Sequence, residues 1–190
     1  MASALEAQGN FPAAEAAFQE AIASRRRLQG NEHPDTAWTL YNYAFFLRHK
    51  GDVAGAVRVS REVLALRGRV LSDTHPMVAA TLQVLGLSLL DQGDARGALP
   101  LLRDSLALRH QSLPAGHWLI ATGEGALGEC LAALGRNGEA EALLLASYES
   151  LRARRGDTHE HTVDARQRLV RFYERTARPH DAARYRTPPS

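Results

Sequence analysis

Cysteine and lysine are nearly absent from this chain of 190 residues, which contains one of each. A single cysteine, Cys130, excludes an internal disulfide, and its apolar helical surroundings favour a buried, unreactive thiol. Arginine supplies the other basic residues, yet the formal net charge is only +2. So balanced a composition gives no electrostatic reason to expect a nucleic-acid partner.

Long hydrophobic runs are absent as well. The longest uncharged stretch, residues 77–90, is shorter than the about 20 residues that a membrane-spanning helix needs. The first residues have neither the basic segment nor the apolar segment of a secretory signal. We therefore expect a cytoplasmic protein with no membrane partner.

Patterns typical of catalytic and metal sites are missing too. No Gly-x-Ser-x-Gly turn, kinase signature or glycine-rich phosphate loop occurs. Four of the eight histidines recur at intervals of 42 residues: His33, His75, His117 and His159. Residues one repeat apart cannot approach a shared metal ion to the required 2 Å or so, and we expect them to cap helices. We predict no enzymatic activity, no metal and no cofactor.

The dominant feature of the sequence is this period of 42 residues. Turn glycines repeat it at Gly9, Gly51, Gly93 and Gly135, and small residues repeat it at Ala14, Ala56, Ala98, Ala140 and Ala182. A fixed period without insertions indicates a stacked repeat array. Apolar residues follow helical spacing, and no alternating strand pattern occurs. We predict an all-α, right-handed solenoid of stacked antiparallel helix pairs.

The period divides the chain into a single array over residues 1–186 and a tail at 187–190. A partial repeat covers 1–30, full repeats cover 31–72, 73–114 and 115–156, and an incomplete repeat covers 157–186. The partial repeat includes the end of a helix over 2–9. In the first full repeat we expect helices at 35–50 and 53–71.

Proline and glycine mark two places where this regularity weakens. Pro100 lies beyond the first turn of its helix, where it bends the helix or removes a hydrogen bond. Three glycines, Gly123, Gly125 and Gly128, fall within one helix. Each lowers the stability of that helix by roughly 1 kcal/mol relative to alanine.

The packing positions of the repeats resemble those of a known family. They are Leu82, Leu85, Gly86, Leu89 and Ala98, matched by Leu40, Tyr43, Ala44, Leu47 and Ala56, and in part by Leu127, Gly128, Leu131 and Ala140. This pattern resembles the tetratricopeptide repeat. The period and the His-Pro opening resemble its long subtype, found in kinesin light chains and many bacterial multidomain proteins. The resemblance implies binding of protein segments on a concave face, but packing residues do not identify a partner.

The same resemblance implies that the first helix of each repeat lines the groove. Helical spacing then places nine residues on that face: Trp38, Tyr41, Asn42, Phe45, Gln83, Leu87, Glu129, Arg168 and Arg171. Trp38, Tyr41 and Phe45 form one aromatic stripe, which with Asn42 suits the anchoring of a peptide. The stripe equally fits packing on the helix at 2–9 or on a missing part of a larger protein, and the sequence leaves both interpretations open.

A basic stripe lies near the other end of the array, at Arg168, Arg171 and Arg175. Such a stripe can grip a carboxylate or a phosphate. The nearby acids Asp164 and Glu174 favour a salt-bridged, solvated face instead.

These observations predict a non-catalytic scaffold that binds a peptide or helix of a partner protein in the groove. The alternative is a structural or self-association segment of a larger multidomain protein, such as a signalling protein. Partial repeats at both ends leave apolar faces uncovered, and such faces favour self-stacking.

Overall fold

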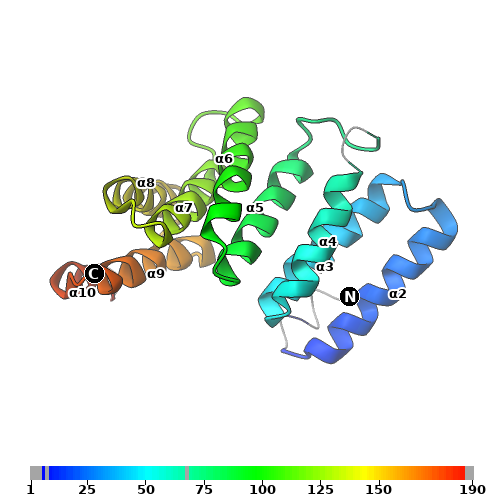
Figure 1. The fold of residues 1–190 in the computed structure, drawn as a ribbon, viewed down its shortest axis with the longest axis horizontal. Coiled ribbons are helices and arrows are strands. Elements are labelled where there is room, and N and C mark those ends of the chain that lie inside the picture. The colour runs from blue at the N-terminus through cyan, green and yellow to red at the C-terminus, as the bar shows by residue number, and fades with distance from the viewer. Residues whose placement is uncertain (1–5, 7–8, 67–68, 187–190) are drawn as a thin grey trace. The chain divides into compact units, whose positions relative to one another are not determined.

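Figure 1 shows the computed structural model of the chain, which describes residues 6, 9–66 and 69–186. These residues form nine α-helices, so the all-α prediction is confirmed. The helices belong to two compact units, residues 1–93 and 94–190. Within the described residues, no helix combines the length and apolar character needed to cross a membrane.

The first unit contains α2 (Phe11–Gln29), α3 (Pro34–Lys50), α4 (Val53–Ala65) and α5 (Pro76–Asp91). Each helix packs against the next one along the chain, and α3 also packs against α5. Aromatic rings form the centre of the contact between α2 and α3. The ring centroids of Phe18 and Phe46 are 5.2 Å apart, and those of Phe18 and Tyr43 are 5.6 Å apart.

The second unit contains α6 (Ala95–Ser112), α7 (Trp118–Ala133), α8 (Asn137–Arg155), α9 (Glu160–Arg175) and α10 (Pro179–Arg186). Helix α7 packs against α6, α8 and α9, and its packing repeats the relation that α3 has with its neighbours. The short α10 is held by Tyr185, whose ring packs on Tyr148 at 5.5 Å and on Tyr173 at 5.8 Å. Aromatic packing therefore completes the last helix pair.

The four periodic histidines cap four helices, as predicted. In each case the imidazole Nδ1 accepts a hydrogen bond from the main-chain N–H two residues later, at 3.1–3.2 Å. Asp52 and Asp94 cap the second helices of their pairs through main-chain N–H groups at 2.9 Å. Local chemistry thus restarts a helix at the same phase of each repeat.

The turns between paired helices require a positive φ, which explains their glycines. Gly51, Gly93 and Gly135 have φ of 92°, 84° and 76°. In the last repeat the corresponding residue is Ala177, with φ of 56°. An alanine in this region is strained, so the final turn keeps the repeat geometry at an energetic cost.

Two expectations about helices were wrong. The helix expected over 53–71 ends at Ala65, because buried Leu66 turns the chain and its N–H bonds to the Val63 carbonyl at 3.1 Å. Helix α6 continues through Pro100. That proline is exposed, so water can satisfy the carbonyl that loses its partner. The helix expected over 2–9 lies outside the described residues apart from Glu6 and Gly9, and the tail at 187–190 lies outside them entirely.

The three glycines of α7 permit a close approach to neighbouring helices. A Cβ atom added to Gly128 would lie 3.0 Å from Cγ of Leu144, and one added to Gly125 would lie 2.8 Å from Oγ of Ser147. Helix α7 is continuous through all three glycines. Their cost in helix propensity is therefore offset by packing between α7 and α8.

Candidate functional site

One side of α3 presents large aromatic side chains to solvent. Trp38 is 53% exposed and Phe45 is 51% exposed. Tyr41 lies half-buried between them, with its ring centroid 5.6 Å from that of Trp38. We call these three side chains the α3 aromatic surface.

The rest of α3 explains why these rings face outward. Leu40, Tyr43, Ala44 and Leu47 fill the opposite side of the helix and are buried in the first unit. Because that side already supplies the apolar stripe that the core needs, the exposed rings are additional to core packing. Asn42 is half-buried beside them, and its amide makes no hydrogen bond to the described residues.

The two groove residues predicted on α5 differ in accessibility. Gln83 is half-buried, and its Oε1 is a buried acceptor with no donor among the described residues. Leu87 is only 5% exposed, so it contributes to packing and offers little surface to a ligand.

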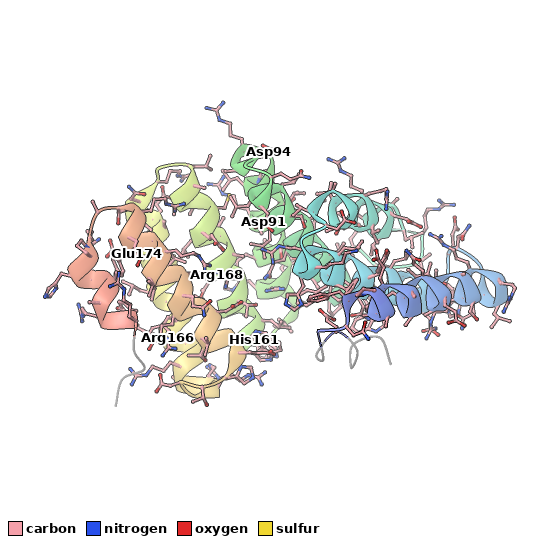
Figure 2. The ribbon with its side chains drawn as sticks, turned by 90° about the horizontal axis from the view of Figure 1, so that it is seen from below. Asp91, Asp94, His161, Arg166, Arg168 and Glu174 are labelled. Atoms are coloured by element: carbon pink, nitrogen blue, oxygen red, sulfur yellow. The ribbon has the colours of Figure 1, made fainter. Side chains whose placement is uncertain are left out.

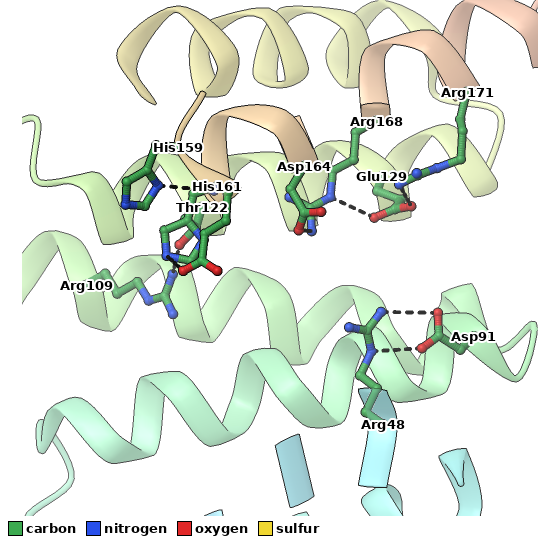
Figure 3. Close-up of polar contacts among 11 residues, drawn as sticks. Arg48, Asp91, Arg109, Thr122, Glu129, His159, His161, Asp164, Arg168 and Arg171 are labelled. Atoms are coloured by element: carbon green, nitrogen blue, oxygen red, sulfur yellow. Dashed lines mark hydrogen bonds and ion pairs between the residues drawn. The ribbon is translucent and has the colours of Figure 1, made fainter. Parts of the chain in front are cut away.

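Ion pairs join the ends of successive first helices in the first unit. Nε of Arg48 lies 2.8 Å from Oδ2 of Asp91, which links α3 to α5 (Figure 3). His49, also on α3, lies 2.8 Å from a carboxylate oxygen of Glu6. Both pairs connect residues about one period apart, so the repeat brings charged positions of neighbouring helices together.

In the second unit, Glu129 is the shared partner of two predicted groove residues. Its carboxylate accepts hydrogen bonds from Nε of Arg168 at 3.0 Å and from an amino group of Arg171 at 3.2 Å (Figure 3). Asp164 is 3.9 Å from Arg168, as the salt-bridged interpretation expects. The Arg168 side chain is only 11% exposed. These charges therefore neutralise one another on α7 and α9.

The remaining predicted acid has a different partner. Glu174, labelled with Arg168 on α9 in Figure 2, pairs with Arg186 of α10 at 2.8 Å. The sequence analysis placed Glu129 in the groove but did not identify it as the partner of the arginines. The signal was present, since Glu129 and Arg171 occupy the same position of successive repeats.

The start of α9 carries a stacked cluster that sequence reasoning missed. The His161 ring stacks on Trp118 at 4.8 Å, and the Arg155 guanidinium lies 4.4 Å from the centre of the same indole. Burial lowers the pKa of His161 and outweighs the attraction of nearby Glu160. Three residues spread over 43 positions meet here, which no local motif reveals.

The described residues hold no group of three or more histidine, cysteine, aspartate or glutamate side chains arranged to bind a metal. Cys130 is buried, as predicted, and its thiol lies 3.3 Å from the Ala95 carbonyl, to which it donates. Burial raises the pKa of this thiol, which disfavours the reactive thiolate.

The chain matches the family model described as "Tetratricopeptide repeat" over residues 1–45 and 39–111. No curated protein matches it. Among solved structures, it is similar to the nearly identical TPR-like repeats of a putative kinesin light chain from Podosopora anserina. That likeness has a TM-score of 0.75 at 21% identity and covers 97% of this chain and 87% of the other.

Two further structures share the fold. A Rap protein complexed with Competence and Sporulation Factor gives a TM-score of 0.81 at 17% identity, over 97% of this chain and 49% of the other. YrrB, titled as a TPR protein with an unusual peptide-binding site, gives 0.55 at 18% identity, over 97% and 78%. These likenesses confirm the helical-repeat solenoid class, which generally serves as a non-catalytic interaction scaffold. The chain belongs to the tetratricopeptide repeat family.

Proposed function

We propose that this chain is a non-catalytic scaffold that binds a peptide segment of a partner protein on the α3 aromatic surface. The observation that carries the proposal is the exposure of Trp38 and Phe45 on the same side of one helix. Large aromatic side chains are costly to leave in water, and contiguous exposed apolar surface is typical of interaction sites.

The side chains of this surface suit a peptide with a large apolar residue. The rings of Trp38 and Phe45 offer rigid apolar area, and tryptophan and tyrosine are enriched among residues that dominate binding energy. The Asn42 amide can both donate to and accept from a peptide backbone. The expected ligand is thus an extended or helical segment with one apolar anchor.

Two of the similar structures support a peptide as the ligand class. The Rap protein was solved in complex with Competence and Sporulation Factor, and YrrB is titled for its peptide-binding site. Those ligands belong to those proteins, and the identity of the partner here rests on experiment.

The test is a selection of displayed random peptides against the wild-type chain, followed by fluorescence anisotropy with the selected peptides. Phe45→Arg should weaken their binding by at least about tenfold, since it removes apolar area from the centre of the surface. Leu28→Arg is the matched control, because Leu28 is a large apolar side chain on α2 that is 75% exposed. Equal affinity for Phe45→Arg and wild type would refute the assignment.

Light scattering on the same proteins addresses self-association. A wild-type mass that rises with concentration, and a Phe45→Arg mass that does not, would assign the α3 aromatic surface to contacts between copies. A constant monomer mass together with peptide binding supports the scaffold.

A further inference from the structure

A pocket lies between α2 and α4, over the side of α3 that faces the core. Its volume is about 350 Å³, and its floor consists of Ile22, Leu40 and Val59. All three are buried, whereas the rim residues Arg26, Arg58 and Glu62 are exposed. Helical spacing places Leu40 on the opposite side of α3 from Trp38 and Phe45, so this pocket is separate from the α3 aromatic surface.

The rim has an unneutralised positive charge. Arg26 and Glu62 form an ion pair from α2 to α4 and largely cancel one another. The Arg58 guanidinium has no acidic partner among the described residues. The positions one and two periods after Arg58 are Pro100 and Ala142, so this arginine is not part of the repeat pattern.

Positive charge continues beyond the pocket along both helices. Residues 19–29 of α2 and 53–65 of α4 together contain five arginines and two glutamates. A ligand that satisfies this charge must extend past a pocket that holds little more than one large side chain. A short chain with an apolar anchor and several carboxylates has that shape and charge.

We infer that the pocket between α2 and α4 is a second binding site, which takes an acidic peptide segment by inserting one large apolar side chain between flanking carboxylates. The anchor packs on Ile22, Leu40 and Val59. One carboxylate pairs with Arg58, and another competes with Glu62 for Arg26. This site goes beyond the proposed function, because its residues, its side of α3 and its ligand charge all differ.

The probe is the fluorescein-labelled pentapeptide Glu-Asp-Trp-Glu-Asp, titrated with the full chain at about 0.15 M salt to screen non-specific attraction. We expect saturable binding, and much weaker binding of the neutral peptide Gln-Asn-Trp-Gln-Asn. Absence of saturable binding of the acidic peptide at up to about 1 mM chain would overturn the inference.

Variants of exposed residues identify the site without disturbing the core. Arg58→Glu should weaken binding by at least about tenfold, because it places a carboxylate opposite the peptide's own. Ala23→Trp should also weaken it by filling the pocket, which Ala23 lines. Glu62→Gln should strengthen it, since Arg26 then loses its internal competitor. Circular dichroism establishes that each variant is folded.

Two controls separate this site from its alternatives. Arg103→Glu makes the same charge change at an exposed position of α6, and binding should remain as in wild type. An equal loss in Arg103→Glu and Arg58→Glu would show general charge attraction and overturn the site. Phe45→Arg should also leave binding unchanged. Loss there, with retention in Arg58→Glu, would move the peptide to the α3 aromatic surface, which refutes this inference and supports the proposed function.

Discussion

Histidine acts in this chain as a helix cap, which requires one form of its ring. An imidazole accepts a hydrogen bond at Nδ1 only when that nitrogen carries no proton. The capping geometry at His33, His75, His117 and His159 therefore selects the neutral ring protonated at Nε2. Since the histidines cap one helix in each of four successive pairs, their contribution to stability is distributed along the chain.

We expect His75→Ala to lower the free energy of unfolding by about 0.5–2 kcal/mol, because the N–H of Met77 loses its acceptor. His75→Asn restores an acceptor at the same position and should retain most of the stability. Urea denaturation followed by circular dichroism measures both changes. Equal losses in the two variants would contradict the capping role.

The cluster at the start of α9 predicts a pH dependence. Burial lowers the pKa of His161, so the unfolded chain binds a proton at this residue more readily than the folded chain. The resulting stability is fully present above the unfolded pKa, near 6.5, and is lost as the pH falls toward the folded pKa. In His161→Phe, which keeps the stack on Trp118, urea midpoints should fall less between pH 7.5 and 5.5 than in wild type. The same fall in both proteins would exclude His161 as a source.

At the scale of elements, glycine has two different roles in the pair α7 and α8. Gly128 lies against Leu144, with 3.0 Å between an added Cβ and Cγ, and 3.2 Å to the Ala140 carbonyl oxygen. Gly138, in the first turn of α8, has no atom within 4 Å of an added Cβ. One glycine is required for the helices to approach, and the other only makes the unfolded chain more flexible.

We therefore expect opposite effects from the same substitution. Gly128→Ala should destabilise the chain by about 1–3 kcal/mol through overpacking. Gly138→Ala should stabilise it by roughly 0.4–1 kcal/mol. Thermal unfolding by calorimetry distinguishes them, and a gain in stability for Gly128→Ala would show that α7 and α8 can separate without cost.

Sequence periodicity was sufficient to predict the helices and their caps, because caps and turns depend on residues close in the chain. The early end of α4 was not predictable, since it depends on the burial of Leu66 and Leu71 in the tertiary structure. The residues of the α3 aromatic surface were identified from helical spacing. The partners of Arg168 were only partly identified, because Glu129 lies on another helix and only alignment by the period relates the two.

At the scale of the molecule, each unit has a core of its own, and repeats interact mainly with their neighbours. Leu85 is buried on α5 in the first unit, and Leu127 is buried on α7 in the second. Stability should therefore be local, with each substitution felt most within its own unit.

Leu85→Ala and Leu127→Ala should each cost about 2–5 kcal/mol by leaving a cavity. Hydrogen exchange should show that Leu85→Ala reduces amide protection chiefly in residues 9–66 and 69–93, and Leu127→Ala chiefly in 94–186. Uniform loss of protection along the whole chain in both variants would instead indicate a single cooperative folding unit.

The phase of the caps has a consequence for how such a chain can change length. A helix begins after the histidine and a turn follows at the glycine at constant positions of each period, so a copied segment of 42 residues carries its own start and stop signals. Residues 75–116, duplicated in tandem, would place a capping histidine at each junction. Growth and loss by whole periods therefore preserve the reading of every cap, whereas an insertion of any other length within a helix shifts the apolar face that follows it.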